Sequence, residues 1–338
     1  MSWSQLHTDV SIPTEEVGVV TMAEPRLRIM PEGMSVHNLP SISAEEELFV
    51  QTHGRNGSDN AALLDMALVG PCQGYIVRIN MKDVMVGFAL SLAHAITIKG
   101  CEPILTGLTT HLCVKEEHRS QGIGMFLIET IIRWGFAKEI HTGYHYLRTP
   151  KTRSAVAMKP WYRPLNVKAC LAAEYQLPTL PSRGFRDTTS LVERTYSLPK
   201  TTASPASLED AAAIISAAQR RITIDPALSW SRLSMPPFIW LKAEGGVACV
   251  RKYVIQGVTR ILAAQLCFFE CLGDATASLR SIFAWLCDHE CIVVHGLAMG
   301  AQLGTDAKMI MANATLHLDF YNVHIPTCSA RQIALMYV

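Results

Sequence analysis

The residues best suited to chemistry lie in one turn, Arg119–Gly124, whose sequence is Arg-Ser-Gln-Gly-Ile-Gly. Two glycines at the start of a helix let the backbone approach a ligand closely. The first amide groups of such a helix have no partner within it and lie at the positive end of its dipole. The turn therefore predicts a site for a pyrophosphate, although a glycine pair taken alone more often marks only a tight turn.

A strand and a helix flank this turn and would hold it in place. Leu112, Cys113 and Val114 end an extended run that begins near Ile104. Beyond the turn, apolar residues recur at a spacing of three to four, which predicts an amphipathic helix. These residues are Ile123, Phe126, Leu127, Ile131 and Trp134. The turn lacks the third glycine of a dinucleotide fingerprint and the Gly-Lys-Ser/Thr of nucleotide phosphate loops, which excludes both.

The first half of the chain predicts a hairpin followed by further strands. Gly74–Asn80 and Val84–Ile98 are separated by a turn at Met81–Asp83, which predicts a β-hairpin. A later strand is predicted over Ile140–Leu147. Before the hairpin, Ala44–Leu68 predicts two short helices around a polar loop, Thr52–Asn60. The glycine, asparagine and serine content of that loop is typical of a mobile lid.

The same order recurs after a proline-rich joint at Pro178–Pro181. Helices are predicted over Leu208–Ile222 and Ala277–Asp288, and strands over Val247–Val254, Arg260–Glu270, Cys291–Met299 and Thr315–His324. This second half has no Arg-x-x-Gly-x-Gly turn before its main helix. As a degenerate repeat it would bind a different ligand.

Length and composition limit the class of protein. A chain of 338 residues is long enough for two domains. Its net charge of +1 gives no bias toward nucleic acid or anionic membranes. The longest apolar run, Val84–Ile98, falls short of the roughly 20 residues of a membrane span. Because the N-terminus shows no signal pattern and Ser2 follows Met1, we expect a cytoplasmic protein. We also expect a monomer without stable membrane insertion.

The cysteine pattern does not favour a metal. Cys267 and Cys271, like Cys287 and Cys291, are separated by three residues rather than the two usual in zinc sites. The ten cysteines of a chain this long without a signal pattern are expected to be reduced and buried. We therefore predict no metal ligands.

The turn after Val114 resembles the acyl-CoA pyrophosphate loop of the GNAT acyltransferase superfamily. Separated stretches over most of the chain also resemble the N-myristoyltransferase family, namely Thr110–Val114, Trp161–Asn166, Tyr196–Pro199, Phe320–Asn322 and the tail Ile333–Val338. The resemblance implies an α+β fold of two tandem GNAT-like units with a pseudo-twofold relation, each a mixed sheet flanked by helices. It implies an N-terminal arm over 1–40, an acyl-CoA-binding unit over 41–195 and a peptide-binding unit over 196–338.

The resemblance also implies an activity: transfer of a fatty acyl group, myristoyl first, from acyl-CoA to the N-terminal glycine of protein substrates. The α-carboxylate of Val338 would accept the proton, and the backbone amides of His111 and Leu112 would form the oxyanion hole. The implied acyl-CoA contacts are Leu112, Cys113, Val114, Arg119, Ser120, Gln121, Gly122, Ile123, Gly124 and Met125. Tyr146, Tyr162 and Tyr321 would bind the acceptor peptide.

Several positions depart from the family pattern. Gly54–Asp59 replaces an acidic lid run, Tyr146 a threonine, Ala298 an aspartate and Met311–Thr315 a glycine-rich loop. His111 replaces a phenylalanine, so its imidazole could act as a base or could be a hydrogen-bonded strand residue. Two alternatives therefore stay open: a GNAT-type transferase that uses another acyl-CoA and amine, and a catalytically silent binder of acyl-CoA or a lipidated peptide.

Overall fold

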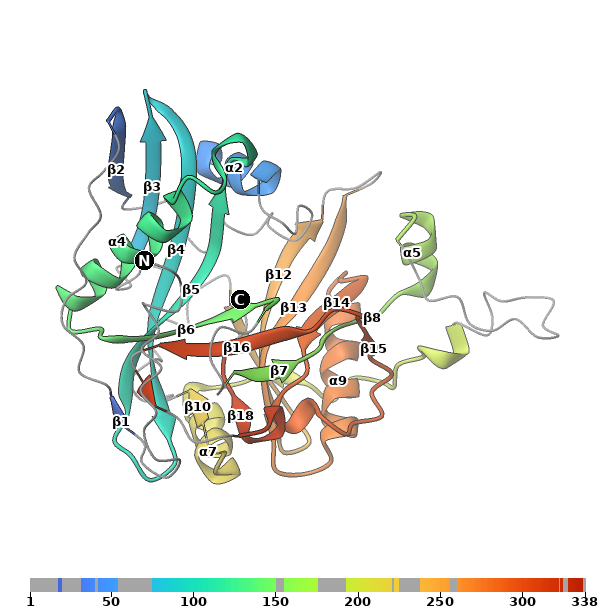
Figure 1. Cartoon of the computed structure of the whole chain (residues 1–338). Helices are drawn as coiled ribbons and strands as arrows, with labels where there is room; N and C mark the ends of the chain where they lie inside the picture. The colour runs from blue at the N-terminus through green and yellow to red at the C-terminus, as the bar shows by residue number, and fades with distance from the viewer. Residues whose placement is uncertain are drawn as a thin grey trace. The chain divides into compact units, whose positions relative to one another are not determined.

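The chain forms two compact units in the computed structural model (Figure 1). Unit 1 comprises Met1–Ala157 and Leu316–Cys328, and unit 2 comprises Met158–Thr315 and Ser329–Val338. The structure describes residues 18–19, 32–39, 42–53, 75–149, 155–175, 193–220, 222–224, 238–255, 260–321, 323–324 and 328–336.

Unit 1 is built on a mixed sheet. Six neighbouring strands of this sheet are, in order, β2 (Met34–Leu39), β3 (Tyr75–Met81), β4 (Val84–Ile98), β5 (Ile104–Val114), β6 (Thr142–Leu147) and β16 (Leu316–Tyr321). All neighbours pair antiparallel except β5 and β6, which are parallel. The hairpin and the strand that ends at Val114 therefore form as the sequence predicts. The structure adds β2, a strand within the segment predicted to be an irregular arm.

The described part of unit 1 also contains two α-helices, α2 (Ala44–His53) and α4 (Ile123–Phe136). The apolar stripe of α4 packs on β3 and β4, where Val77, Ile79, Val86 and Ala89 meet Ile123, Phe126, Leu127 and Ile131. Gly87 permits this approach, because a Cβ there would lie 3.0 Å from a methyl of Ile123. Each such side chain contributes roughly 1.5–3 kcal/mol when it is fully buried.

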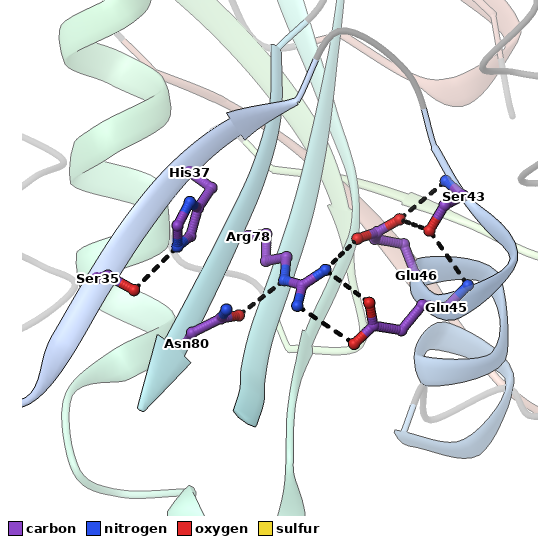
Figure 2. Close-up of polar contacts among 7 residues, drawn as sticks. All are labelled: Ser35, His37, Ser43, Glu45, Glu46, Arg78 and Asn80. Atoms are coloured by element: carbon purple, nitrogen blue, oxygen red, sulfur yellow. Dashed lines mark hydrogen bonds and ion pairs between the residues drawn. The ribbon is translucent and has the colours of Figure 1, made fainter. Parts of the chain in front are cut away.

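An arginine ties α2 to β3, as Figure 2 shows. Arg78 donates from Nη1 to Glu45 at 2.8 Å and to Glu46 at 2.7 Å, and from Nε to Asn80 at 2.7 Å. Glu46 is buried and also accepts from the backbone amide of Ser43. Burial raises the pKa of the Glu46 carboxyl, but the hydrogen bonds from Ser43 and Arg78 outweigh burial and leave that pKa lowered.

Unit 2 contains a second mixed sheet. Its strands, in sheet order, are β15 (Ile310–Met311), β8 (Pro160–Pro164), β14 (Val293–Leu297), β13 (Ile261–Cys271), β12 (Gly246–Ile255), β11 (Phe238–Ala243) and β9 (Ser204–Pro205). Helix α9 (Ala275–Asp288) covers one face through Leu279, Ile282 and Phe283. Asp274 caps this helix by accepting from the amides of Thr276 and Ala277. Three of the four strands predicted for the second half and its main helix are thus present in unit 2, whereas the strand predicted over Thr315–His324 belongs to unit 1.

Smaller elements complete both units. Helices α5 (Val167–Ala172) and α7 (Leu208–Ala218) belong to unit 2, as does the parallel pair of β10 (Ile222–Ile224) and β18 (Ile333–Ala334). Short pairing joins β1 (Gly18–Val19) to β17 (Val323–His324), and β7 spans Val156–Met158. Single 3-10 turns lie at Glu116–His118, Gly300–Gln302 and Ala330–Gln332. Helix α7 ends four residues before the predicted Ile222, because Gln219 adopts a left-handed conformation.

The unit boundaries differ from the division predicted at residues 195 and 196. Strand β8 precedes the proline-rich joint but pairs with β14 and β15, which places it in unit 2. Strand β16 comes late in the sequence but pairs with β6 of unit 1. Segments distant in sequence therefore complete both sheets, which a division based on linker composition does not detect.

Candidate functional site

The predicted CoA-binding stretch begins where two parallel strands of unit 1 diverge. The pairing of β5 with β6 covers only Thr106–Leu108 and Thr142–Tyr144 in the described part of the chain. Beyond Leu108, β5 continues beside β4, whereas β6 continues beside β16. Figure 1 shows the two strands running in different directions from this point. The diverging half of β5 contains His111, Leu112, Cys113 and Val114.

A β-bulge interrupts β5 at His111 and Leu112. The register passes from Thr110 opposite Leu90 to Cys113 opposite Phe88, so two residues of β5 face one residue of β4. His111 has a φ of 53°, a left-handed conformation that histidine tolerates better than most residues. Bulges re-aim backbone and side chains and are common beside active sites. The bulge thus lies at the two residues expected to form the oxyanion hole.

The side chains at the bulge have different environments. The His111 Nδ1 lies 3.0 Å from the Thr110 hydroxyl, and the Leu112 side chain is 39% exposed. Burial raises the pKa of the Cys113 thiol to about 12, although Arg119 acts in the opposite direction. A thiol with that pKa stays protonated at neutral pH and is a poor nucleophile. The predicted chemistry needs no thiolate here.

The turn before α4 brings two residues of left-handed conformation to the N-terminus of a helix. Ser120 and Gly122 have φ values of 65° and 86°, and Gly122 is the N-cap of a helix of 14 residues. No side chain caps this helix terminus. A Cβ at Gly124 would meet only Val114, at 3.8 Å, which is ordinary contact. Gly122 is therefore required by its backbone conformation, whereas the fold of the chain itself does not require a glycine at 124.

The basic residues of the turn are held by the protein. Arg119 donates from Nε to the carbonyl of Val114 at 3.1 Å and from Nη2 to the carbonyl of His53 at 3.2 Å. Lys115 forms an ion pair with Glu117 at 2.7 Å. Among the described residues, Arg119 thus contacts only neutral carbonyls, whereas a carboxylate neutralises Lys115. Arg119 is therefore the better candidate partner for a phosphate.

Two of the three predicted acceptor-binding tyrosines lie in unit 1 on neighbouring strands. Tyr146 of β6 is opposite Leu318, and Tyr321 of β16 is opposite Gly143. The Tyr321 ring covers Gly143 so closely that a Cβ there would lie 1.9 Å from it. Burial raises the pKa of the Tyr321 hydroxyl, which therefore remains protonated. Tyr162 lies on β8 of unit 2, opposite His295.

Some predicted residues lie outside the described part of the chain. These are Val338, the expected proton acceptor, and the lid segment Gly54–Asp59. Of the tail, β18 covers Ile333–Ala334, and the following Leu335 and Met336 are buried.

The sequence reasoning missed a set of polar residues within unit 2. Arg251 and Gln265 lie inside β12 and β13, strands that consist mostly of apolar residues, and both are buried. A charged residue within an apolar strand was the available signal, because burial of a charge is costly unless it has a role. His295 of β14, opposite Gln265, belongs to the same set.

The described residues contain neither a candidate metal site nor a candidate membrane span. No group of three His, Cys, Asp or Glu side chains there could hold a metal ion. Within the same ranges, no helix is both long enough and apolar enough to cross a membrane.

A hairpin, a bulged strand, a turn and a helix, with a second mixed sheet in the same chain, make up an α+β fold of two tandem GNAT-like units. Comparison with solved structures narrows it to the fold of N-myristoyltransferases. Saccharomyces cerevisiae N-myristoyltransferase with bound myristoyl-CoA has a TM-score of 0.75 at 12% identity, covering 96% of this chain and 92% of that chain.

Two further structures of the same yeast enzyme agree. One with bound myristoyl-CoA has a TM-score of 0.73 at 14% identity and covers 96% of this chain and 88% of its own. One with myristoyl-CoA and inhibitors has a TM-score of 0.70 at 12% identity, covering 96% and 89%. No family model matches the chain, and no curated protein matches it. The likeness is therefore one of fold.

Proposed function

We propose that this protein transfers a fatty acyl group, myristoyl in the first place, from acyl-CoA to the N-terminal glycine of protein substrates. The observation that carries the proposal is the bulge at His111 and Leu112, followed directly by the uncapped N-terminus of α4. The pyrophosphate would bind the amides of Ser120–Gly124 with Arg119 beside them. The thioester would then lie along the diverging half of β5.

The reaction needs an oxyanion hole and a base. A thioester is already activated, so the chain must orient an amine, accept its proton and stabilise the tetrahedral oxyanion. The proposed oxyanion donors are the amides of His111 and Leu112, and loss of such a donor typically costs about 2.7–4 kcal/mol. Met125 and Ile123, in the first turn of α4, would contact the acyl-CoA through the helix terminus.

The proposed base is the α-carboxylate of Val338, by resemblance. An N-terminal ammonium has a pKa of about 8 and an α-carboxyl one of about 3.5, which makes the transfer unfavourable in water. Burial raises the pKa of a carboxyl and lowers that of an amine, by up to roughly 3–5 units. A buried carboxylate could therefore deprotonate the amine. Tyr146, Tyr162 and Tyr321 would contact the acceptor.

Mass spectrometry tests the proposal directly. Incubation with myristoyl-CoA and a glycine-initiated octapeptide should add one myristoyl group to the peptide, and the same peptide with an acetylated N-terminus should remain unmodified. The variants His111→Phe and His111→Gly distinguish a role of the His111 backbone amide from a role of its imidazole. Both variants should remain active if only the backbone amide takes part. Loss of activity in both, with normal folding, would make the imidazole itself the base.

A second candidate is a transferase for a shorter acyl group and another amine. The bulky Tyr146, which stands where the resemblance expects threonine, favours it. Calorimetric titration with CoA esters of increasing chain length separates the two, because each buried methylene contributes about 0.8 kcal/mol. Affinity that rises steadily to myristoyl-CoA supports the first candidate, and affinity independent of length supports the second. Binding of myristoyl-CoA without transfer to any amine would indicate a silent binder.

A further inference from the structure

The sheet of unit 2 carries a row of polar side chains across four adjacent strands. Arg251 of β12 is opposite Gln265 of β13, Gln265 is opposite His295 of β14, and His295 is opposite Tyr162 of β8. Residues directly opposite each other on paired strands have side chains on the same face. We name these four residues the polar row.

The polar row lies on the face of the sheet away from α9. The alternate residues of the same strands pack with α9 in one apolar cluster, which includes Trp161, Val250, Ala264, Leu266 and Val294. Because successive side chains of a strand point to opposite faces, the polar row occupies the other face. It is therefore separate from the apolar core that stabilises unit 2.

Hydrogen bonds hold two parts of the polar row in place. Arg251 donates from Nη2 to Oε1 of Gln265 at 2.5 Å, and its guanidinium carbon lies 5.9 Å from the centre of the Tyr253 ring. The Tyr253 hydroxyl hydrogen-bonds Nδ1 of His295, and the Tyr175 hydroxyl lies 2.7 Å from its Nε2. Two tyrosines thus fix the orientation of the His295 ring.

Arg251 is the residue of the row that indicates a ligand. Its side chain is buried, the residue being 2% exposed, and Nε and Nη1 have no hydrogen-bond partner in the described ranges. Gln265, its one hydrogen-bonded partner there, carries no charge. A guanidinium remains protonated in proteins, and a buried charge is costly unless an opposite charge compensates it. The missing partner is therefore expected to be an anion.

We propose that Arg251 binds a carboxylate of the acceptor substrate, an inference that rests on the proposed acyltransferase function. The guanidinium suits a carboxylate because both groups are planar and form strong, charge-assisted hydrogen bonds. Tyr162, at the other end of the row, is a proposed acceptor contact. The acceptor thus lies along the row, and its class is a peptide with an acidic side chain.

The sheet geometry sets the position of that acidic residue. Three strand spacings of about 4.8 Å separate Arg251 from Tyr162, a distance of roughly 14 Å. An extended peptide rises about 3.3 Å per residue, so this distance corresponds to about four residues. The acidic residue should therefore lie about four positions from the acceptor residue that contacts Tyr162.

A scan of synthetic peptides tests the proposal. Glycine-initiated octapeptides that carry one Glu at each position from two to eight are compared with their Gln counterparts by fluorescence anisotropy in the presence of CoA. One position should bind at least about tenfold tighter with Glu, the size expected of a hydrogen bond to a charged group. In Arg251→Gln the ratio should fall to about one. The control Lys252→Gln, whose side chain lies on the α9 face over Trp285, should keep it.

Two further measurements decide between outcomes. The urea midpoint of Arg251→Gln should be unchanged or raised, because a lone buried cation has been removed. A large drop would show that a carboxylate of the chain itself neutralises Arg251, which overturns the proposal. Gln265→Glu offers a second variant, since it places a carboxylate beside Arg251 and should abolish the preference for Glu peptides. A preference that persists in Gln265→Glu contradicts the proposal.

Acyl transfer to the same peptides separates this inference from the proposed function. If Gln and Glu peptides bind with equal affinity and both are acylated, the role of Arg251 is refuted and the acyltransferase function stands. Binding that depends on Glu without any transfer supports Arg251 and refutes the enzyme. If the protein shows neither Glu-dependent binding nor acyl transfer, both proposals are overturned.

Discussion

Arg119 donates a hydrogen bond from Nη2 to the main-chain carbonyl of His53, 3.2 Å away, although the two residues are 66 positions apart. His53 is the last residue of α2, and Arg119 begins the turn before α4. The other end of α2 is held by Arg78 through Glu45 and Glu46 (Figure 2). The candidate pyrophosphate turn is thus fixed to a helix that two arginines anchor.

Replacement of Arg119 should weaken CoA binding. Arg119→Gln removes a charge-assisted contact to phosphate and the hydrogen bond to His53, so the dissociation constant for CoA should rise about tenfold or more. Calorimetric titration at two salt concentrations measures the effect, and the variant should show the weaker salt dependence. Arg133→Gln, at the C-terminal end of α4, is the matched control and should bind CoA like the wild type.

The two glycines of the turn should respond differently to alanine. Gly124→Ala should leave folding stability unchanged or raise it by up to about 1 kcal/mol, since alanine is the better helix former. The same variant should bind CoA more weakly, because the added methyl keeps the pyrophosphate from the backbone. Gly122→Ala should destabilise by about 1–2 kcal/mol, because its φ is 86°. Equal CoA affinity in the wild type and in Gly124→Ala would show that CoA does not bind at this turn.

The ion pair on α2 should make the protein sensitive to acid. The pKa of Glu46 is lowered from 4.5, so its contribution to stability is present above pH 4.5 and is lost as the pH falls through the lower folded value. Glu46→Gln should cost about 2 kcal/mol at pH 7, the scale of a hydrogen bond to a charged group. Urea unfolding at pH 7 and pH 3 measures both effects. Glu45→Gln is the control and should cost less than about 1 kcal/mol, because that carboxyl is exposed.

His295 should add a second pH dependence at higher pH. Burial lowers the pKa of its imidazole from 6.5 to about 4, so the unfolded chain binds the proton more readily between these values. Stability should therefore fall as the pH drops from 7 to 5, by up to about 2 kcal/mol. In His295→Gln, the urea midpoint should depend less on pH over this range. An unchanged slope in the variant would assign the dependence to other groups.

Extension of the chain tests the proposed base. One alanine appended after Val338 moves the α-carboxylate by about 3.3 Å, the rise of one extended residue. Transfer should fall by several orders of magnitude while CoA binding, measured by calorimetry, is retained. Amidation of the terminus by ligation should have the same effect without added length. Normal turnover in both proteins would exclude the carboxylate from proton transfer.

The local elements of unit 1 could be predicted from sequence because their signals are local. Alternation and turn residues define the hairpin of β3 and β4, and three-to-four spacing defines α4. The turn Arg119–Gly124 is a short motif whose backbone geometry follows from its glycines. The fold class, in contrast, was predicted from the resemblance of separated stretches to a known family.

Other parts depended on contacts between distant segments. Strand β2 forms because its backbone pairs with β3, although its own sequence alternates poorly. Strand β16 adds to β6 across about 170 residues, and β8 joins the second sheet rather than the first. Pairing partners and register are set by the assembled sheet, so no window of sequence contains them.

The sequence by itself thus determined which residues of the turn before α4 could hold a pyrophosphate. Only the tertiary structure decided that β5 bulges at His111 and that Arg119 contacts His53. It also aligned Arg251, Gln265, His295 and Tyr162, which belong to four different strands. A motif contained in one turn can be read locally, whereas a row of side chains across a sheet exists only once the strands have paired in register.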